Sequence, residues 1–250
     1  GANVYQCNKC KHHTTPKVGT LMEKSPLPYK TWLWAIYLVA VDKRGISAMA
    51  LMRQLHVTYK TAWFLLHRIR AAMGSRDEKY LLDGCVEFDD SYFGGTHTGG
   101  KRGRGTDKTP VLLAVSKDKR GIARFMKLRV VPNLKGATVG KFAAETIAPG
   151  STIESDALRS YQKALREKYN HNWQIFDTEK EMLIWLHTIV SNVKEDILGT
   201  FHGVSRKYLQ RYLDEIAYRF NRRFMQPVLF DHLLDAVTDS KPLRLELLKG

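Results

Sequence analysis

Two adjacent aspartates, Asp89 and Asp90, stand within the hydrophobic segment VEFDDSYFGG of residues 86–95. The β-branched and aromatic residues of this segment favour a strand, and the two glycines at its end favour a turn. Because side chains alternate along a strand, Glu87 and Asp89 point to one face, and Phe88 and Asp90 point to the other. A carboxylate at the end of a hydrophobic strand lowers stability unless a positive charge lies beside it. The pair is therefore either a solvated strand end or part of a cation site.

A third aspartate, Asp156, ends a short strand predicted at residues 151–156. The elements predicted after residue 80 alternate between strand and helix. The first strand is followed by strands at 110–116 and 122–131, a helix at 138–147, the strand that ends at Asp156, a helix at 158–169, a strand at 173–176 and a helix at 187–198. This is the order of the ribonuclease H-like fold, an α/β architecture in which helices flank a mixed sheet.

In that fold the first and fourth strands lie side by side, so Asp89 and Asp156 would meet. Two carboxylates that are brought together repel each other unless a divalent cation lies between them. Oxygen ligands suit Mg²⁺ or Mn²⁺ rather than Zn²⁺. The order of elements thus predicts a Mg²⁺ (or Mn²⁺) site that is built on Asp89 and Asp156.

The chain is strongly basic: among its 250 residues, 40 Lys and Arg oppose 25 Asp and Glu, which gives a formal net charge of +15. Such an excess indicates a polyanionic partner, and nucleic acid is the first candidate. The basic residues are spread over many segments, which argues against a membrane-surface helix. The longest apolar stretch, residues 32–41, is too short to span a bilayer. With three cysteines and no signal peptide at the start, we expect a reducing, cytoplasmic compartment.

Cys7 and Cys10 form a CxxC pair, and two histidines, His12 and His13, follow it. A turn of this kind aims two thiolates at one tetrahedral ion and makes one half of a zinc ribbon. A structural zinc site needs four ligands, yet no second CxxC follows, and the histidines lie too close to complete an ordinary ribbon. We expect residues 1–25 to be a partial zinc ribbon, with Zn²⁺ on Cys7 and Cys10 and the other half upstream of residue 1. The alternative is a remnant that binds no metal.

Residues 26–76 have the pattern of a helix-turn-helix domain. Ser47 is a good N-cap for a helix at 48–55, a turn follows at 56–58, and a second helix is expected at 59–73. The second helix carries basic side chains that would read a groove or contact phosphates, namely Lys60, His67, Arg68 and Arg70. An ordinary helical hairpin with a solvated basic face is the alternative, and the net charge favours DNA binding.

A glycine-rich, basic segment follows the first strand, GGTHTGGKRGRGTDK at residues 94–108. It contains no residue that would pack in a core. Its basic side chains Lys101, Arg102 and Arg104 are predicted to contact DNA. A plain mobile loop is the alternative.

Three segments of the chain together resemble one known family. They are VEFDDSYFGG, GISAMALMRQLHVTYKTAWFLLHRIRAAM and HTIVSNVKEDILGTFHGVSRKYLQRYLDEIAYRFNRRF. They are similar to the DDE-type transposases of bacterial insertion sequences related to Merlin elements, the IS fifteen-ninety-five group. The resemblance runs from the CxxC pair to about residue 230, and it implies a zinc ribbon and a helix-turn-helix domain before a ribonuclease H-like catalytic domain at 77–230. Residues 231–250 are expected to be a C-terminal tail.

The resemblance also implies an activity and its partners. The activity is DNA cleavage and strand transfer assisted by Mg²⁺, and the partner is double-stranded DNA, both the ends of the element and the target. The location is then the bacterial cytoplasm, associated with the nucleoid. Because two DNA ends must be held together, we expect a homodimer or a higher homo-oligomer.

Carried over residue by residue, the first and second acidic positions of the family fall on Asp89 and Asp156. The third falls near Asn192, with 35 residues between it and Asp156, and Asn192 with Lys194 matches a variant of some members. The implied roles are that Asp89 bridges two metal ions, Asp156 holds one and Asn192 the other. Lys194 would contact a phosphate near the scissile bond. Local alternatives for the third position are His187, Glu195, Asp196 and Glu215.

Two other functions are weighed against a transposase. The first is a DNA-binding protein derived from a transposase that has weakened or lost catalysis, which Asn192 and the incomplete zinc pair favour. The second is a nuclease that cuts DNA without joining it, and this function would not need the module at residues 47–73. A protein without catalysis has no physical reason to keep both Asp89 and Asp156.

Overall fold

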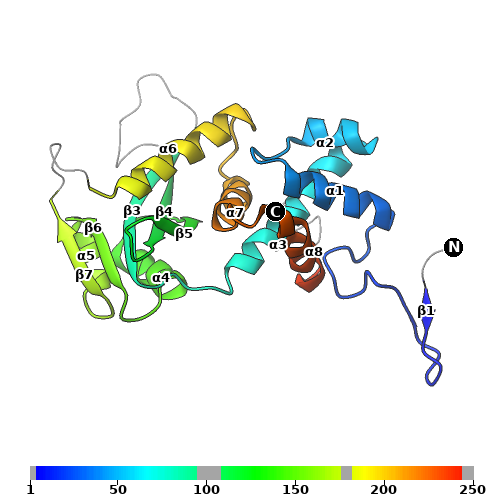
Figure 1. Ribbon diagram of the computed structural model, residues 1–250, viewed down its shortest axis with the longest axis horizontal. Coiled ribbons are helices and arrows are strands. Elements are labelled where there is room, and N and C mark those ends of the chain that lie inside the picture. Colours follow the sequence, from blue (N-terminus) through cyan, green and yellow to red (C-terminus); the bar gives the residue numbers. More distant parts are fainter. Residues whose placement is uncertain (1–3, 95–107, 176–181, 244–250) are drawn as a thin grey trace. The chain divides into compact units, whose positions relative to one another are not determined.

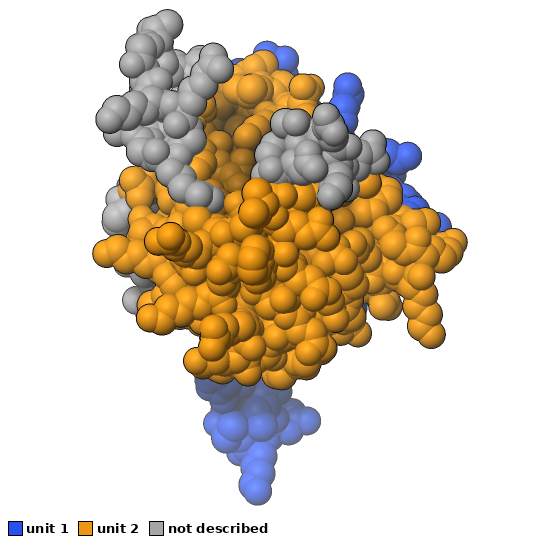
Figure 2. All heavy atoms as spheres, turned by 90° about the vertical axis from the view of Figure 1, so that its left-hand side faces the viewer, with its two compact units in different colours: residues 1–77, 222–250 blue, residues 78–221 orange. Residues whose placement is uncertain are grey.

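A computed structural model describes residues 4–94, 108–175 and 182–243 of the chain. The chain divides into two compact units: unit 1 comprises residues 1–77 and 222–250, and unit 2 comprises residues 78–221 (Figures 1 and 2). The boundary predicted after residue 76 lies next to the end of the first segment of unit 1. The C-terminal part differs from the prediction, which gave residues up to 230 to the catalytic domain and the rest to a tail.

Unit 1 is helical apart from a short hairpin. The hairpin pairs β1 (Tyr5–Gln6) with β2 (His13–Thr14), and the helices are α1 (Tyr29–Val41), α2 (Ala48–Leu55), α3 (Tyr59–Asp77), the 3₁₀ turn η1 (Gln226–Val228) and α8 (Leu229–Asp239). Apolar side chains from four of these helices are buried, among them Trp32, Ile36, Leu51, Leu65, Ile69 and Leu233. Because α8 packs against α1 and α3, it completes the core of unit 1 instead of forming a tail.

Both helices predicted around residues 56–58 are present. Ser47 Oγ accepts a hydrogen bond from the Ala50 N–H at 3.2 Å and so caps α2. His56 has a left-handed backbone with a φ of 51° and ends α2, and α3 begins at Tyr59. That these helices form a DNA-binding helix-turn-helix remains a prediction.

An ion pair and a hydrogen bond join the two sequence segments of unit 1, residues 1–77 and 222–250. Arg222 Nη1 lies 2.7 Å from Asp77 Oδ1, and each side chain is only 10% exposed. The N–H of Leu21 also donates to the carbonyl of Val237 at 3.2 Å. These contacts join residues distant in sequence, and they explain why residues 222–250 belong with residues 1–77.

Unit 2 contains a five-stranded mixed sheet. Its strands are β3 (Cys85–Phe93), β4 (Thr109–Lys117), β5 (Ala123–Val130), β6 (Thr152–Asp156) and β7 (Asn170–Gln174), and their order across the sheet is β5-β4-β3-β6-β7. β3 pairs antiparallel with β4 and parallel with β6. The predicted α/β architecture is confirmed, and the first and fourth strands of this sheet are neighbours, as expected.

Helices cover both faces of the sheet (Figure 1). On one face α4 (Gly136–Thr146) and α5 (Arg159–Leu165) pack on side chains such as Phe88, and on the other α6 (Ile184–Gly199) and α7 (Leu209–Asn221) pack on side chains such as Leu113. Alternation along β3 and β4 therefore supplies two separate core layers. Within the described ranges, no helix has the length and apolar character that crossing a bilayer requires.

Candidate active site

Asp89 and Asp156 lie at the same end of two paired parallel strands. β3 and β6 are in register from Cys85 opposite Thr152 to Phe88 opposite Ser155. Each aspartate is the next residue of its strand, so the two follow the last matched pair on strands about 4.8 Å apart. Asp156 is also anchored locally, because its Oδ1 accepts a hydrogen bond from the Leu158 N–H at 3.1 Å. The predicted meeting of the two aspartates agrees with this register.

Asp90 points to the opposite face of the sheet, as alternation predicts. Its Oδ1 accepts a hydrogen bond at 2.6 Å from the hydroxyl of Tyr161, a fully buried residue of α5. Burial, together with the negative charges of Asp90 and Asp89, raises the pKa of this hydroxyl above its usual range. The hydroxyl therefore stays protonated and keeps donating. This contact separates Asp90 from the face that carries Asp89.

Helix α6 brings His187 to Asp89. The helix packs against β3, and its buried residues Leu186, Ile189 and Val193 recur at helical spacing. His187 Nε2 lies 3.9 Å from Asp89 Oδ2, and the exposed fractions of the two side chains are 50% and 19%. This separation is too long for a hydrogen bond. It is close to the spacing of about 3–4 Å between two ligands that each lie about 2.1 Å from one octahedral ion.

Asn192 lies on another side of α6 from His187. Five residues of α-helix turn the side chain through about 140°, whereas the seven residues from His187 to Lys194 return almost to the same side. Asn192 is exposed, and the buried stripe of α6 separates its flank from that of His187. The arrangement therefore favours His187, which the sequence suggested only as a local alternative, over Asn192 as the third group of the site.

Lys194 lies near the end of β3, on the His187 side of the helix. Its Nζ is 5.6 Å from the centroid of the Phe93 ring. Lys108, which precedes the partner of Phe93 on β4, packs its side chain against Gly94. Burial and the charge of Lys108 lower the pKa of the Lys194 ammonium. Two cations thus lie beside one strand end, where an anion such as a phosphate would be stabilised. Lys108 ends the basic segment 94–108 but was not among the side chains predicted to contact DNA.

The remaining alternatives for the third position have other surroundings. Glu215 of α7 is 1% exposed and accepts hydrogen bonds from the Arg219 guanidinium at 2.8 and 3.1 Å. Burial raises the pKa of Asp196, although the charge of Arg219 lowers it. Glu195 is exposed and lies only three residues from Asn192 on α6. None of these contacts is with Asp89.

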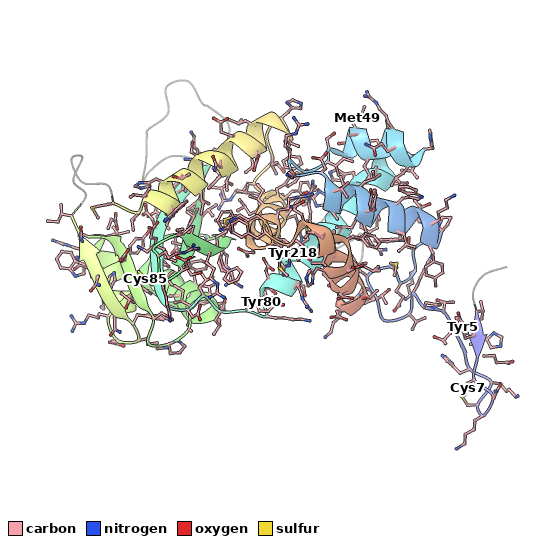
Figure 3. The ribbon with its side chains drawn as sticks, in the orientation of Figure 1. Tyr5, Cys7, Met49, Tyr80, Cys85 and Tyr218 are labelled. Carbon is pink, nitrogen blue, oxygen red and sulfur yellow. The ribbon has the colours of Figure 1, made fainter. Side chains whose placement is uncertain are left out.

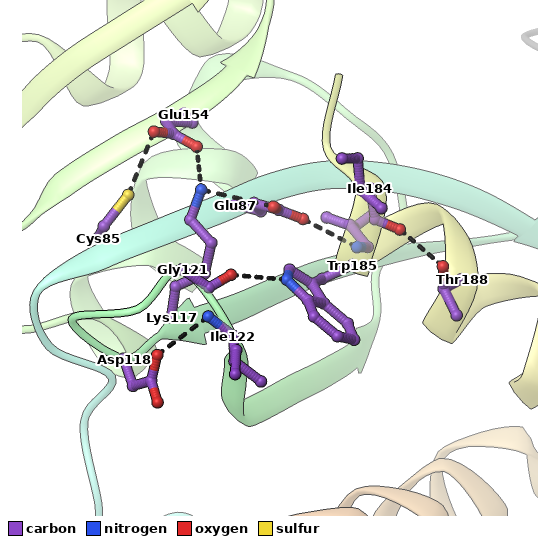
Figure 4. Close-up of polar contacts among 11 residues, drawn as sticks. Cys85, Glu87, Lys117, Asp118, Gly121, Ile122, Glu154, Ile184, Trp185 and Thr188 are labelled. Atoms are coloured by element: carbon purple, nitrogen blue, oxygen red, sulfur yellow. Dashed lines mark hydrogen bonds and ion pairs between the residues drawn. The ribbon is translucent and has the colours of Figure 1, made fainter. Parts of the chain in front are cut away.

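A partly buried polar network lies one residue pair further back on the same face (Figure 4). Lys117 Nζ of β4 lies 2.5 Å from Glu154 Oε2 and 3.5 Å from Glu87 Oε1. Burial alone would lower the pKa of Lys117 and raise that of Glu154. Their mutual contact outweighs burial, so the pKa of Lys117 is raised and that of Glu154 is lowered. Cys85 Sγ donates to Glu154 Oε1 at 3.2 Å, and burial and this hydrogen bond raise the pKa of its thiol. Alternation placed Glu87 on this face, but no sequence signal indicated Lys117.

The residues predicted to contact DNA from α3 are only partly available. Lys60 is exposed. The side chains of His67, Arg68 and Arg70 are buried, with exposed fractions of 0%, 7% and 2%. These three side chains therefore do not form a basic surface, and the prediction that they contact DNA is corrected. Arg68 donates to the carbonyl of Leu243 at 3.0 and 3.2 Å, and the ring of His67 lies 4.1 Å from that of Trp63. Interactions within unit 1 thus replace solvent around them. The predicted contacts Lys101, Arg102 and Arg104 lie outside the described residues.

The predicted zinc site is not supported. Cys7 and Cys10 are exposed, free thiols between β1 and β2, and Figure 3 shows Cys7 in this hairpin. Hydrogen bonds from the backbone of Cys10 and Lys9 lower the pKa of the Cys7 thiol, as a metal-binding turn would require. Across the described ranges, however, no three His, Cys, Asp or Glu side chains form a group that could hold a metal ion. Two thiolates alone do not complete a tetrahedral site.

The donors at the end of β3 and β6 nevertheless suit a divalent ion. Two carboxylates on rigid neighbouring strands and an imidazole are a donor set for Mn²⁺ or Mg²⁺. Among the described residues, no three such side chains converge closely enough to hold one ion, so metal binding at Asp89, Asp156 and His187 would require a change of rotamer. The half-exposed side chain of His187 has solvent around it in which to make such a change.

Comparison with known proteins places this site within a family. Residues 81–221, more than half of the chain, match the ISXO2-like transposase domain. The chain belongs to this transposase family. The matched segment nearly coincides with unit 2, so the ISXO2-like domain includes the sheet, its four helices and the pair Asp89 and Asp156.

Solved structures offer only distant likenesses. The catalytic core domain of BIV integrase has 12% identity and a TM-score of 0.36, over 54% of this chain and 82% of that one. The Mos1 mariner paired end complex with Mn has 12% identity and a TM-score of 0.34, over 86% and 79%. The Mos1 transposase paired-end complex with left transposon end has 13% identity and a TM-score of 0.26, over 89% of this chain and 83% of that one. At these values the likenesses carry no argument about this chain. No curated protein matches its sequence.

Proposed function

We propose that this ISXO2-like transposase binds the ends of an insertion sequence, cleaves DNA there with Mg²⁺ or Mn²⁺, and joins the freed strand to target DNA by in-line phosphoryl transfer. Family membership supports the transposase class. The observation that carries the proposed chemistry is the position of Asp89 and Asp156 at the same end of paired parallel strands, with His187 3.9 Å from Asp89. We assign the third ligand position to His187.

Asp89, Asp156 and His187 would hold the metal. A bound divalent ion polarises a phosphoryl oxygen and makes a water or a hydroxyl group a better nucleophile. Asp89 is fixed by β3, which has a strand on each side, and its Oδ1 accepts a hydrogen bond from the Asp90 N–H at 2.8 Å. His187 is exposed enough to meet DNA. Lys194 would contact a phosphate oxygen of the DNA and hold the DNA strand beside the end of β3.

DNA recognition is proposed for unit 1. Lys60 is the exposed basic residue that remains of the predicted set on α3, and it lies in the first turn of that helix. This is the part of a recognition helix that contacts base edges or phosphates in helix-turn-helix proteins. Because two ends have to be held together during transposition, we propose that the active assembly contains at least two copies of the chain.

The test is a joining assay. The protein is incubated with labelled candidate end DNA, a target plasmid and Mg²⁺ or Mn²⁺, and products are separated by size. We expect cleaved and joined DNA from the wild type and neither from Asp89→Asn or Asp156→Asn. Asp83→Asn is the matched control, because Asp83 is exposed and precedes the same strand. We expect this control to retain both products.

Each other outcome identifies a different function. Cleavage without joining would indicate a nuclease, and a gel shift without either product would indicate a DNA-binding protein without catalysis. Joined product from Asp89→Asn or Asp156→Asn would overturn the proposed site. Addition of EDTA separates binding from chemistry, because it should abolish both products while leaving the gel shift in place.

A further inference from the structure

We propose that Glu87 is a positioning residue: its buried carboxylate holds the first turn of α6 against β3 and thereby places His187 beside Asp89. The inference rests on the proposed function only for its catalytic consequence. Glu87 is 3% exposed, and its Oε2 accepts a hydrogen bond at 2.8 Å from the backbone N–H of Leu186 (Figure 4). Leu186 directly precedes His187, and Glu87 lies two residues before Asp89 on the same strand face. One hydrogen bond therefore links the two elements next to the site.

Helix α6 has no cap of its own at its start. The residue before it, Leu183, has a left-handed backbone with a φ of 50° and a side chain that cannot accept a hydrogen bond. The first N–H groups of a helix have no partner within the helix, and an acceptor from outside satisfies them. Glu87 supplies that acceptor from the sheet, so the cap of α6 is a contact between β3 and the helix. The position of the helix start is thus tied to the strand that carries Asp89.

The charge of Glu87 is compensated from two sides. Lys117 Nζ lies 3.5 Å from its Oε1, and the first turn of α6 presents the positive end of the helix dipole to its Oε2. A buried carboxylate without such partners would be strongly destabilising. Lys117 in turn contacts Glu154 at 2.5 Å. The contacts with Lys117 and with the Leu186 N–H therefore hold the Glu87 carboxylate oriented toward the helix.

A second contact keeps α6 folded when the first is removed. Trp185 Nε1 donates to the carbonyl of Gly121 at 2.7 Å, and this bond ties the helix start to the turn after β4 (Figure 4). The apolar residues Leu186, Ile189 and Val193 also stay buried against the sheet. Loss of the Glu87 contact should therefore loosen the first turn without unfolding the helix.

The experiment compares two substitutions of similar length. Glu87→Gln keeps an oxygen that can accept from Leu186, whereas Glu87→Met keeps the length but has no such acceptor. We expect Glu87→Met to reduce single-turnover cleavage about 10- to 100-fold, the range for losing a group that orients a metal ligand, and Glu87→Gln to stay close to the wild type. The matched control is Glu154→Met, which removes the other partner of Lys117 but no contact with α6. We expect this control to cleave like the wild type.

A double-mutant cycle tells positioning from a general loss of structure. If Glu87 acts through His187, Glu87→Met should have no further effect on cleavage in a His187→Ala background. Equal losses in both backgrounds would overturn the inference, as would an equal loss in Glu154→Met. Affinity for end DNA should be unchanged in Glu87→Met, Glu87→Gln and Glu154→Met.

Hydrogen–deuterium exchange tests the same inference without activity. In Glu87→Met the amides of residues 184–187 should exchange at least about tenfold faster, because the external acceptor is gone, whereas Glu154→Met should leave them unchanged. Unchanged exchange in Glu87→Met would overturn the inference even in an active enzyme. If the wild type neither cuts nor joins DNA, the proposed function fails, and the exchange result still decides the role of Glu87.

Discussion

The identity of the third ligand is the sharpest prediction, and four substitutions on one helix test it. They are His187→Ala, His187→Glu, Asn192→Ala and Asn192→Glu. His187 lies 3.9 Å from Asp89 and is half-exposed, while Asn192 is exposed on another side of α6. All four changes are therefore expected to leave the fold intact, within about 0.5 kcal/mol for the exposed positions. Differences in activity can then be assigned to the site.

The expected magnitudes follow from charge and distance. Removing a direct ligand should cost at least the 10- to 100-fold that loss of an orienting partner costs, so His187→Ala should fall by about 100-fold or more. A carboxylate about 4 Å from a divalent ion gains about 2 kcal/mol even in bulk water, which is roughly a 30-fold change in affinity. His187→Glu should therefore work at a Mg²⁺ concentration about 30-fold lower than the wild type. Its cost without metal is repulsion from Asp89 of about 1 kcal/mol.

The assay is single-turnover cleavage of end DNA as a function of Mg²⁺ or Mn²⁺ concentration. The wild type should prefer Mn²⁺, because an imidazole ligand suits a transition metal better than it suits Mg²⁺. Asn192→Ala and Asn192→Glu should stay within about twofold of the wild type at every concentration. The reasoning is refuted if Asn192→Ala loses activity while His187→Ala keeps it, or if His187→Glu leaves the Mg²⁺ requirement unchanged.

Three further predictions concern other contacts. Replacing Arg222 by Ala removes its ion pair with the buried carboxylate of Asp77 and should lower the free energy of unfolding by about 3–5 kcal/mol, measured by denaturant unfolding. Tyr161→Phe removes a hydrogen bond to the carboxylate of Asp90 and should cost about 1.5–3 kcal/mol in the same measurement. Lys194→Ala should reduce by about one the slope of log binding constant against log salt for end DNA, because one phosphate contact is lost.

Each of these predictions has a control or a contrary outcome. The exposed pair Arg76 and Asp239, 3.4 Å apart, is the control for Arg222: Arg76→Ala should cost at most about 1 kcal/mol. An equally small effect of Arg222→Ala would mean that the buried pair does not fasten unit 1. For Tyr161→Phe, unchanged unfolding would show that the hydroxyl bond contributes nothing. A salt slope that stays the same in Lys194→Ala would remove Lys194 from the DNA contacts.

Much of unit 2 was predictable because its elements carry strong local patterns. Alternation in residues 85–93 placed Asp89 and Asp90 on opposite faces, and the contact of Asp90 with Tyr161 on the α5 side agrees. Breaks at Gly121 and Gly150 separated the elements where the structure has turns. The order of strands and helices then implied that β3 and β6 are neighbours, which the pairing confirms.

Helix α3 shows where pattern reasoning failed. A row of basic residues predicts an exposed face, but Arg68 finds its partner in the carbonyl of Leu243, which lies 175 residues away. Nothing near Arg68 in the sequence indicates that partner. The same holds for the C-terminal helix α8. Its residues were predicted to belong to a tail, but its apolar side chains are buried in the core of unit 1.

The sequence by itself determined the order of the strands and helices of unit 2 and the opposite faces of Asp89 and Asp90, because these depend on local periodicity and on chain order. It did not fix the element bounds, since β7 is Asn170–Gln174 and α6 begins at Ile184, three residues before their predicted starts. Only the tertiary structure decided which side of α6 faces β3, and so whether His187 or Asn192 stands beside Asp89. Helical spacing fixes the angle between two side chains but not the rotation of the whole helix. That rotation is set by burial of Leu186, Ile189 and Val193 and by the hydrogen bond between Glu87 and Leu186, contacts that join residues about 100 positions apart.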